Sequence, residues 1–304
     1  MGLALSSSWN AFRYSNGVPL IQEIKSLGFD EVELSFNLTS SMFKDIEDLV
    51  KKRFIQVTSL HNYCPIPTGL KRKNALPDYY SLASIDGPQR KKAVLETKKT
   101  IDSASRVKAK AVVLHCGRVE IPDPTRALIG LYNRGLTGTA EFQDLKKDVI
   151  RRRKAKAGPF LENTLKSLGE LNKYALSKSI KLGIETRFYY REIPCFEEIG
   201  IILGKFRNSS LFYWHDTGHA EVMDRLGLAR HMAFLDSYSP DLLGMHLHNI
   251  QGCIDHQAPV EGDFDFKSLK PYLTGEAIKV IEAHHPATPE DLIESKKQLE
   301  ALFG

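Results

Sequence analysis

The chain has 304 residues, of which 42% are hydrophobic and 26% are charged, and its formal net charge is +5. These values are ordinary for a globular protein and exclude wholesale disorder, a collagen-like repeat and a small disulfide-framework protein. The mild excess of Lys and Arg is compatible with an anionic substrate but does not require nucleic acid. No apolar run approaches the roughly 20 residues that span a bilayer, so we expect no membrane partner.

The N-terminal stretch and the cysteines point to a cytoplasmic protein. Residues 1–9 lack the basic flank and long apolar run of a secretory signal. Cys64, Cys116, Cys195 and Cys253 are scattered, with no C-x-x-C pair among them. We therefore expect reduced thiols, with neither a zinc ribbon nor a disulfide framework.

Short apolar, β-branched runs recur along the whole chain and predict eight strands. They lie at residues 3–7, 31–35, 55–60, 111–115, 181–185, 211–215, 243–248 and 278–282. The stretches between them have helical spacing, as in residues 19–27, which Gly28 ends. Strand and helix alternating eight times predicts one (β/α)8 barrel over residues 1–304. A doubly wound sheet is the alternative, but it gives no reason for eight strands.

Two long connections follow the third and fourth strands. Residues 62–90 contain four prolines, and residues 117–160 contain several glycines and prolines, including the pair Gly158-Pro159, which we read as a break. Loops of this length in a barrel are expected to decorate the carboxyl ends of the strands, where sites are built.

The predicted strands from the third onward end in acidic or imidazole side chains. These strand-end residues are His61, His115, Glu185, Asp216 with His219 after it, His246, His248, and Glu282 with His284 after it. Such side chains converge above a barrel mouth. Because converging carboxylates repel one another, the pattern predicts a divalent cation among them, and Mn²⁺, Co²⁺, Zn²⁺ and Mg²⁺ all suit these ligands.

Four segments resemble the xylose-isomerase-like barrel superfamily, the sugar phosphate isomerase/epimerase group that also contains endonuclease IV. They are Gly183-Ile184-Glu185, Asp216-Thr217-Gly218-His219, His246-Leu247-His248-Asn249 and Val280-Ile281-Glu282, and the stretch from His256 to Asp265 is similar to a further segment of that family. The resemblance runs nearly the full chain. It implies a metal-dependent enzyme that isomerises or epimerises a sugar, sugar phosphate or keto-polyol through a metal-stabilised enediolate.

The resemblance also implies residue roles. The implied metal ligands are Glu185, Asp216, His246 and Glu282, and His248 is the rival of His246 because it has the same strand parity. Glu185 and Glu282 are the implied groups that exchange the substrate proton. The expected substrate-binding residues are His61, His115, His219, His256, Arg187 (or Arg191) and Trp9. Alternatively, Trp9 is a residue of the hydrophobic core.

Three other functions stay open at this point. Cleavage of abasic DNA, as in endonuclease IV, uses three zinc ions, but Ile254 stands where that enzyme has an acidic ligand, and Asp255 lies one residue later. The basic run of residues 146–156 has no interleaved aromatic residues, so we expect no nucleic-acid partner. Dehydration of a keto-polyol and a non-catalytic binding scaffold are the remaining alternatives. We expect a small carbohydrate as substrate, and relatives indicate a possible homo-oligomer.

Overall fold

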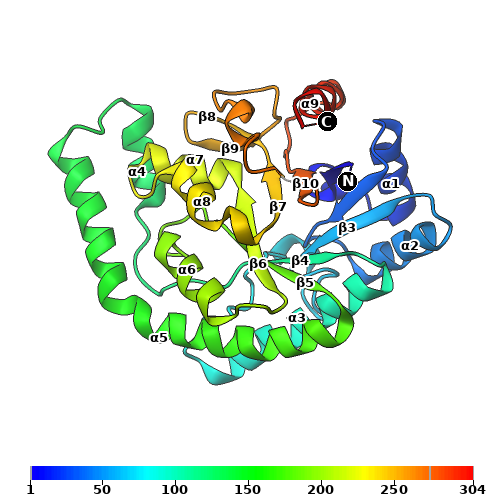
Figure 1. Ribbon diagram of the computed structural model, residues 1–304, viewed down its shortest axis with the longest axis horizontal. Coiled ribbons are helices and arrows are strands. Elements are labelled where there is room, and N and C mark those ends of the chain that lie inside the picture. Colours follow the sequence, from blue (N-terminus) through cyan, green and yellow to red (C-terminus); the bar gives the residue numbers. More distant parts are fainter. Residues whose placement is uncertain (1, 274, 304) are drawn as a thin grey trace.

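The computed structural model of the chain describes residues 2–273 and 275–303, and its centre is a closed barrel of eight parallel strands (Figure 1). The strands are β1 (Leu3–Ser6), β2 (Glu31–Leu34), β3 (Gln56–His61), β4 (Ala111–Leu114), β5 (Lys181–Glu185), β6 (Leu211–Asp216), β7 (Leu242–Leu247) and β10 (Ile278–Ile281). Their order around the barrel is β1-β10-β7-β6-β5-β4-β3-β2. The predicted (β/α)8 barrel is confirmed, and each predicted strand lies within one residue of its observed bounds.

Strand register brings the late strand ends to one level. Asp216 pairs with His246 between β6 and β7, and Val280 pairs with His246 between β10 and β7. The backbone N–H of Glu282, just beyond β10, donates to the carbonyl of Leu247 at 3.2 Å. Because all strands are parallel, these residues meet at the same end of the barrel.

Helices follow most of the strands and surround the barrel (Figure 1). They are α1 (Gly17–Ser26), α2 (Ser40–Lys51), α3 (Gly87–Arg106), α4 (Thr125–Asn133), α5 (Ala140–Lys178), α6 (Phe196–Lys205), α7 (Thr217–Arg225), α8 (His231–Tyr238) and α9 (Pro289–Phe303). Short 3-10 turns lie at Ser7–Trp9, Ala11–Arg13, Arg72–Asn74, Ser239–Asp241 and Phe266–Leu269. No helix of the described residues is long and apolar enough to cross a membrane.

Helix α5 corrects the sequence interpretation of the fourth connection. It runs unbroken for 39 residues through the Gly158-Pro159 pair that we read as a break, and Figure 1 shows it along the left and lower edge of the molecule. Pro159 and Ala155, the residue whose carbonyl lacks the N–H partner that a proline cannot supply, both lie on the exposed side of the helix. Arg153 anchors α5 from the other side: it is 4% exposed and binds both carboxylate oxygens of Glu198 at 2.9 and 2.7 Å.

Trp214 fills the interior of the barrel beneath the late strand ends. It is fully buried, and two glycines of neighbouring strands make room for it. A Cβ at Gly183 would lie 2.9 Å from the indole, and a Cβ at Gly244 would lie 2.6 Å from it. The indole ring lies edge-on to the His246 ring, with centroids 5.1 Å apart. Trp214 therefore supports His246 from below.

A small antiparallel hairpin follows β7 and was not predicted. Its strands are β8 (Asn249–Gln251) and β9 (Ile254–Gln257), and it carries His256 in the left-handed region, at φ 55°. The hairpin packs against α7. It brings a histidine from the connection after β7 back over the end of the barrel. The four cysteines are unpaired.

Candidate metal centre

A pocket of about 610 Å³ opens at the carboxyl ends of the barrel strands. Polar residues at or just after the ends of β3, β4, β5 and β10 line it, namely His61, His115, Glu185 and Glu282. Apolar and aromatic side chains also line it, among them Phe36, Leu76, Phe188, Tyr189 and Ile254. Since barrel sites lie at this end of the strands, the pocket is the candidate functional site.

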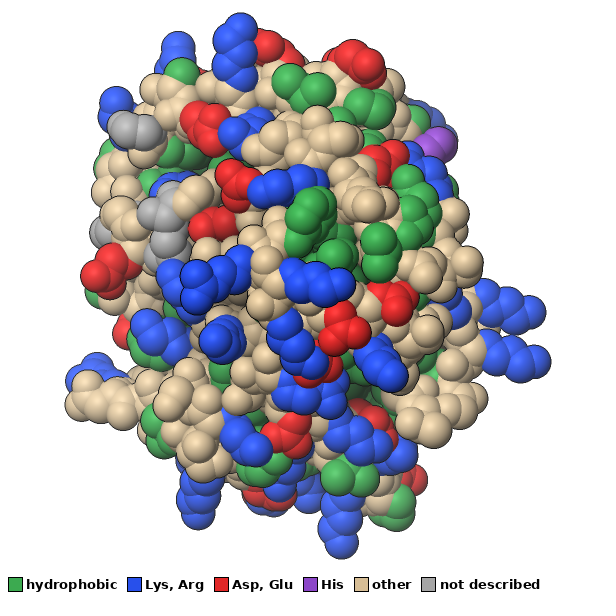
Figure 2. Space-filling model, turned by 90° about the vertical axis from the view of Figure 1, so that its right-hand side faces the viewer, with side chains coloured by type: hydrophobic (Ala, Val, Ile, Leu, Met, Phe, Trp, Pro, Cys, Tyr) green, Lys and Arg blue, Asp and Glu red, His purple; other side chains and the backbone are tan. Residues whose placement is uncertain are grey.

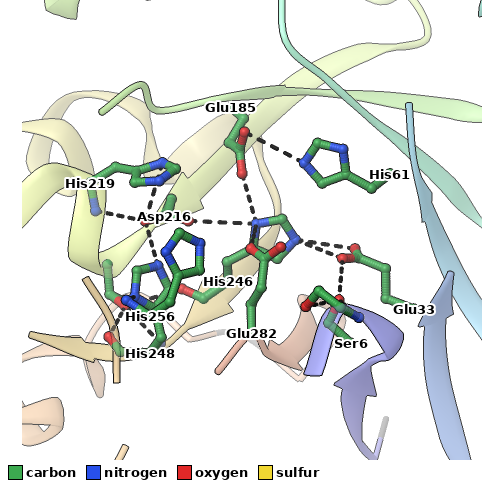
Figure 3. A network of polar contacts seen from close by, with 12 residues as sticks. Ser6, Glu33, His61, Glu185, Asp216, His219, His246, His248, His256 and Glu282 are labelled. Carbon is green, nitrogen blue, oxygen red and sulfur yellow. Dashed lines mark hydrogen bonds and ion pairs between the residues drawn. The ribbon is translucent and has the colours of Figure 1, made fainter. Parts of the chain in front are cut away.

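Four acidic and imidazole side chains at this end of the barrel, two of which line the pocket, converge on one point (Figure 3). One ligand atom from each of Glu185, Asp216, His246 and Glu282 lies within 4.8 Å of the others. The Nδ1 atom of His246 lies 2.7 Å from Glu185 Oε1, 2.8 Å from Glu282 Oε2 and 3.6 Å from Asp216 Oδ2. The structure thus brings together the four side chains that the sequence resemblance implied as metal ligands.

His246 is oriented by a residue that the sequence reasoning missed. Its Nε2 atom lies 3.0 and 3.1 Å from the two carboxylate oxygens of Glu33, which is fully buried on β2. Ser59 donates to Glu33 Oε2 at 2.7 Å and fixes that carboxylate. Because a carboxylate only accepts, Nε2 carries the proton and Nδ1 is the atom that a metal would bind.

Charge around His246 favours a cation. Burial alone would lower the pKa of His246, but Glu282 and Glu33 outweigh it and hold that pKa well above its ordinary value. The imidazole is therefore protonated, and its Nδ1 proton occupies the point where the three carboxylates meet. A divalent cation at the same point would replace this proton and carry more charge.

Asp216 is held by one oxygen and leaves the other free. Its Oδ1 atom accepts from the backbone N–H of His219 at 2.7 Å, at the start of α7, and from His248 Nε2 at 2.9 Å. Its Oδ2 atom is buried and has no hydrogen-bond partner among the described residues. Such an atom is costly unless a ligand satisfies it. Since Oδ2 faces His246, a metal ion at the shared point fits the donor set.

The same contacts separate His248 from its rival. The backbone N–H of His256 donates to His248 Nδ1 at 2.9 Å, so the proton of the neutral ring is on Nε2, where it bonds to Asp216. Both nitrogens of His248 are therefore committed, whereas His246 presents Nδ1 to the carboxylates. The geometry favours His246 as the ligand and gives His248 the role of positioning Asp216.

Glu185 has one oxygen on each side of the pocket floor. Oε1 faces His246, while Oε2 lies 2.7 Å from His115 Nε2 and forms an ion pair with Arg187. Burial would raise the pKa of Glu185, but the hydrogen bond from His115 Nε2–H and the charge of Arg187 hold that pKa well below its usual value. Burial, aided by Arg187, lowers the pKa of His115 to about 3, so this ring is neutral. Glu185 is thus a fixed anion.

The expected substrate-binding residues divide into two sets. His61, His115, His219, His256 and Arg187 all line the pocket. Arg187 is directed at Glu185 and at Glu192, 3.3 Å away, rather than into open space. Trp9 does not line the pocket: it is fully buried in the core, where its Nε1 donates to the carbonyl of Ala287 at 2.8 Å. The expected contact of Trp9 with substrate is therefore wrong, and the alternative interpretation of Trp9 as a core residue is correct.

Barrel and strand-end cluster together define a (β/α)8 protein with a candidate divalent-metal centre. Residues 21–301 match the xylose isomerase-like TIM barrel family, and the chain belongs to this family. No curated protein sequence matches the chain.

Solved structures of similar fold cover nearly the whole chain. A putative xylose isomerase from Rhodospirillum rubrum is 16% identical, with a TM-score of 0.72 and 99% of both chains covered. A D-allulose 3-epimerase from Methylomonas sp. in complex with D-allulose is 13% identical, with a TM-score of 0.69, covering 100% of this chain and 97% of that one. A D-tagatose 3-epimerase-like protein is 18% identical, with a TM-score of 0.65 and coverages of 99% and 97%. At these identities the likeness establishes the fold.

Proposed function

We propose that the protein is a divalent-metal-dependent isomerase or epimerase of a sugar, sugar phosphate or keto-polyol. The observation that carries the proposal is the convergence of Glu185, Asp216, His246 and Glu282 beneath a pocket of about 610 Å³. Membership of the xylose isomerase-like family supports it, as do the sugar epimerases among the proteins of similar fold. We propose a small carbohydrate as the partner in the pocket.

The pocket lining suits a sugar. Phe36, Phe188 and Tyr189 offer aromatic surface against which the C–H face of a sugar ring can pack, while histidines at the floor supply hydrogen-bond partners for hydroxyl groups. His61 donates Nδ1–H to the carbonyl of Asn62 at 3.2 Å, and His219 donates Nδ1–H to the carbonyl of Thr186 at 3.0 Å. The Nε2 atom of His61 lies 3.9 Å from Glu185 Oε2, and that of His219 lies 3.7 Å from Asp255 Oδ2, so each can bond to a substrate hydroxyl held near these carboxylates.

The two glutamates are not equivalent as proton-transfer groups. When bound, the metal would supply positive charge where negative charge develops on the substrate oxygens. Oε2 of Glu185 is held by His115 and Arg187, so this carboxylate has no oxygen free to take a proton from carbon. Glu282 bonds to His246 through Oε2, and its Oε1 makes no hydrogen bond among the described residues. We therefore assign the removal of the carbon-bound proton to Glu282 Oε1.

Hydrogen exchange into substrate tests the proposal. The Mn²⁺-loaded protein is incubated in heavy water with a panel of ketoses, their phosphates and keto-polyols, and NMR follows carbon-bound deuterium. We expect incorporation with at least one compound and a loss of about 10²–10⁴-fold in Glu282→Gln. Glu31→Gln, at the opposite end of β2, is the matched control and keeps the wild-type rate. Absence of deuterium in every compound contradicts the proposal, and a product lighter by one water identifies dehydration.

Cleavage of abasic DNA has less support. Ile254 is 58% exposed on the hairpin and offers no ligand atom, and the Arg187 guanidinium already occupies the outer oxygen of Glu185. In the basic run on α5, Arg151 pairs with Asp148 and Arg153 is buried. Figure 2 shows the right-hand side of the view in Figure 1, where Lys and Arg side chains gather across the middle and lower part with fewer Asp and Glu among them. Chelator-sensitive nicking of a duplex with an abasic analogue at low salt would revive this candidate.

A further inference from the structure

Beyond the central point, three more groups of side chains at the pocket offer ligand atoms within 4.8 Å of one another. They are His61, His115 and Glu185; His219, His248 and His256; and His256, Glu282 and His284. The contacts of their nitrogens and oxygens decide which of them has ligand atoms to spare.

Two of the three groups are already satisfied. In the first, the guanidinium of Arg187 is bonded to the same Glu185 oxygen that the histidines approach, so a second positive charge there would be repelled. In the second, both ring nitrogens of His248 are used, one by the backbone N–H of His256 and the other by Asp216. Neither group can coordinate a cation without breaking existing bonds.

The third group has free ligand atoms. Nε2 of His284 is buried and has no hydrogen-bond partner among the described residues. His256 bonds to Asp255 Oδ2 through Nδ1 at 2.9 Å, and its Nε2 makes no hydrogen bond within the part of the chain that the structure describes. Its ring lies against that of His284, with centroids 3.9 Å apart and planes 11° apart. Glu282 adds the Oε1 atom that the central cluster does not use.

Backbone structure holds the two rings in place. His284 donates its backbone N–H to the carbonyl of His256 at 2.9 Å, and His256 is itself fixed by its N–H bond to His248. The left-handed conformation of His256 turns the end of the hairpin over the barrel. These bonds fix the main chain of both residues, and because the stacked rings lie in nearly parallel planes, the side chains must rotate to bring both Nε2 atoms onto one ion.

We propose that His256, His284 and Glu282 form a second cation site, selective for Zn²⁺ or Co²⁺, which shares Glu282 with the central site. Two imidazoles and one carboxylate are a donor set typical of zinc with an open coordination position, whereas Mg²⁺ prefers oxygen ligands. The central site, with three oxygens and one nitrogen, accepts any of these ions. The site rests on the proposed function for one consequence: a cation on Glu282 Oε1 occupies the proton-transfer atom, so excess Zn²⁺ inhibits.

Counting bound ions tests the site separately from the activity. The full chain is freed of metal with chelator, dialysed against a small excess of Zn²⁺ or Mg²⁺ alone, and analysed for bound metal. We expect two Zn²⁺ but no more than one Mg²⁺ per chain, and one Zn²⁺ in both His284→Ala and His256→Ala. His285→Ala, an exposed histidine next to the site, is the control and keeps two. The paired histidine variants guard against misfolding of either one.

Any other number of bound metal ions per chain contradicts the proposed second site. One Zn²⁺ in the wild type leaves the central site and the proposed function standing while removing the second site. Two in the wild type and two in both histidine variants place the second ion elsewhere. No bound ion at all removes the second site and the proposed metal-dependent function together. A Mn²⁺-loaded wild type that exchanges substrate hydrogen equally well in excess Zn²⁺ contradicts the inhibition.

Discussion

Glu33 is the buried carboxylate whose replacement tests the central site most directly. In Glu33→Gln the side chain keeps its size, and the amide oxygen can still accept from His246 Nε2 while the negative charge is lost. Replacing such a carboxylate behind a metal-binding histidine typically costs about 10–100-fold in metal affinity. That range corresponds to about 1.4–2.7 kcal/mol of binding free energy. Because Glu33 is fully buried and bonded to both His246 and Ser59, we expect the upper half of that range.

The effect of Glu33→Gln has a pH dependence that a merely structural defect lacks. Glu33 also helps to raise the pKa of His246, so its loss lowers the pKa of the proton that the metal must displace. The variant therefore binds most weakly relative to wild type at high pH, and the difference shrinks as the pH falls. Competition between the protein and a chromophoric chelator for Mn²⁺, at several pH values, measures both effects. Ser59→Ala, which removes one hydrogen bond to Glu33, is the control and loses only a fewfold. Wild-type affinity in Glu33→Gln at every pH would refute the reasoning.

Further predictions concern proton release, packing and the long helix. Metal affinity of the wild type rises about tenfold per pH unit below the raised pKa of His246, with one proton released per ion, and calorimetry in buffers of different ionisation enthalpy counts that proton. Gly244→Ala lowers the free energy of unfolding by about 1–3 kcal/mol, because the added Cβ would lie 2.6 Å from Trp214; an unchanged urea midpoint contradicts this. Arg153→Ala lowers the free energy of unfolding by about 3–5 kcal/mol, because the buried Glu198 carboxylate loses its partner. Arg152→Ala, at an exposed position, changes the free energy of unfolding far less.

Sequence patterns located the barrel because each inner strand is a short apolar run, buried on both faces. They also located the central cluster, because parallel strands place their last residues at one end. Glu33 was missed because Glu31-Val32-Glu33 alternates like a strand with one solvated face. In a barrel strand both faces are buried, so an acidic residue in mid-strand is itself a signal of a polar partner inside.

Other features of the site and the fold depend on three-dimensional contacts that a sequence pattern does not reveal. His246 and His248 share strand parity, and only the bonds to their individual nitrogens separate them. The unbroken course of α5 through Pro159 depends on which side of the helix the proline faces. Trp9 follows a strand end as a substrate-binding residue would, but an early turn folds it into the core.

Asp216 serves two structures with one side chain. Oδ1 caps the first turn of α7 through the His219 amide, while Oδ2 lies 3.6 Å from His246 Nδ1, where the four side chains converge. A metal ion bound to Oδ2 therefore also immobilises the carboxylate that caps the helix. Metal binding and local unfolding of α7 are for this reason coupled in free energy. Hydrogen exchange of the His219 amide should slow when metal binds. Asp216→Asn can still cap the helix, so it shows the effect of losing the metal ion alone. Asp216→Ala loses both the metal ion and the helix cap.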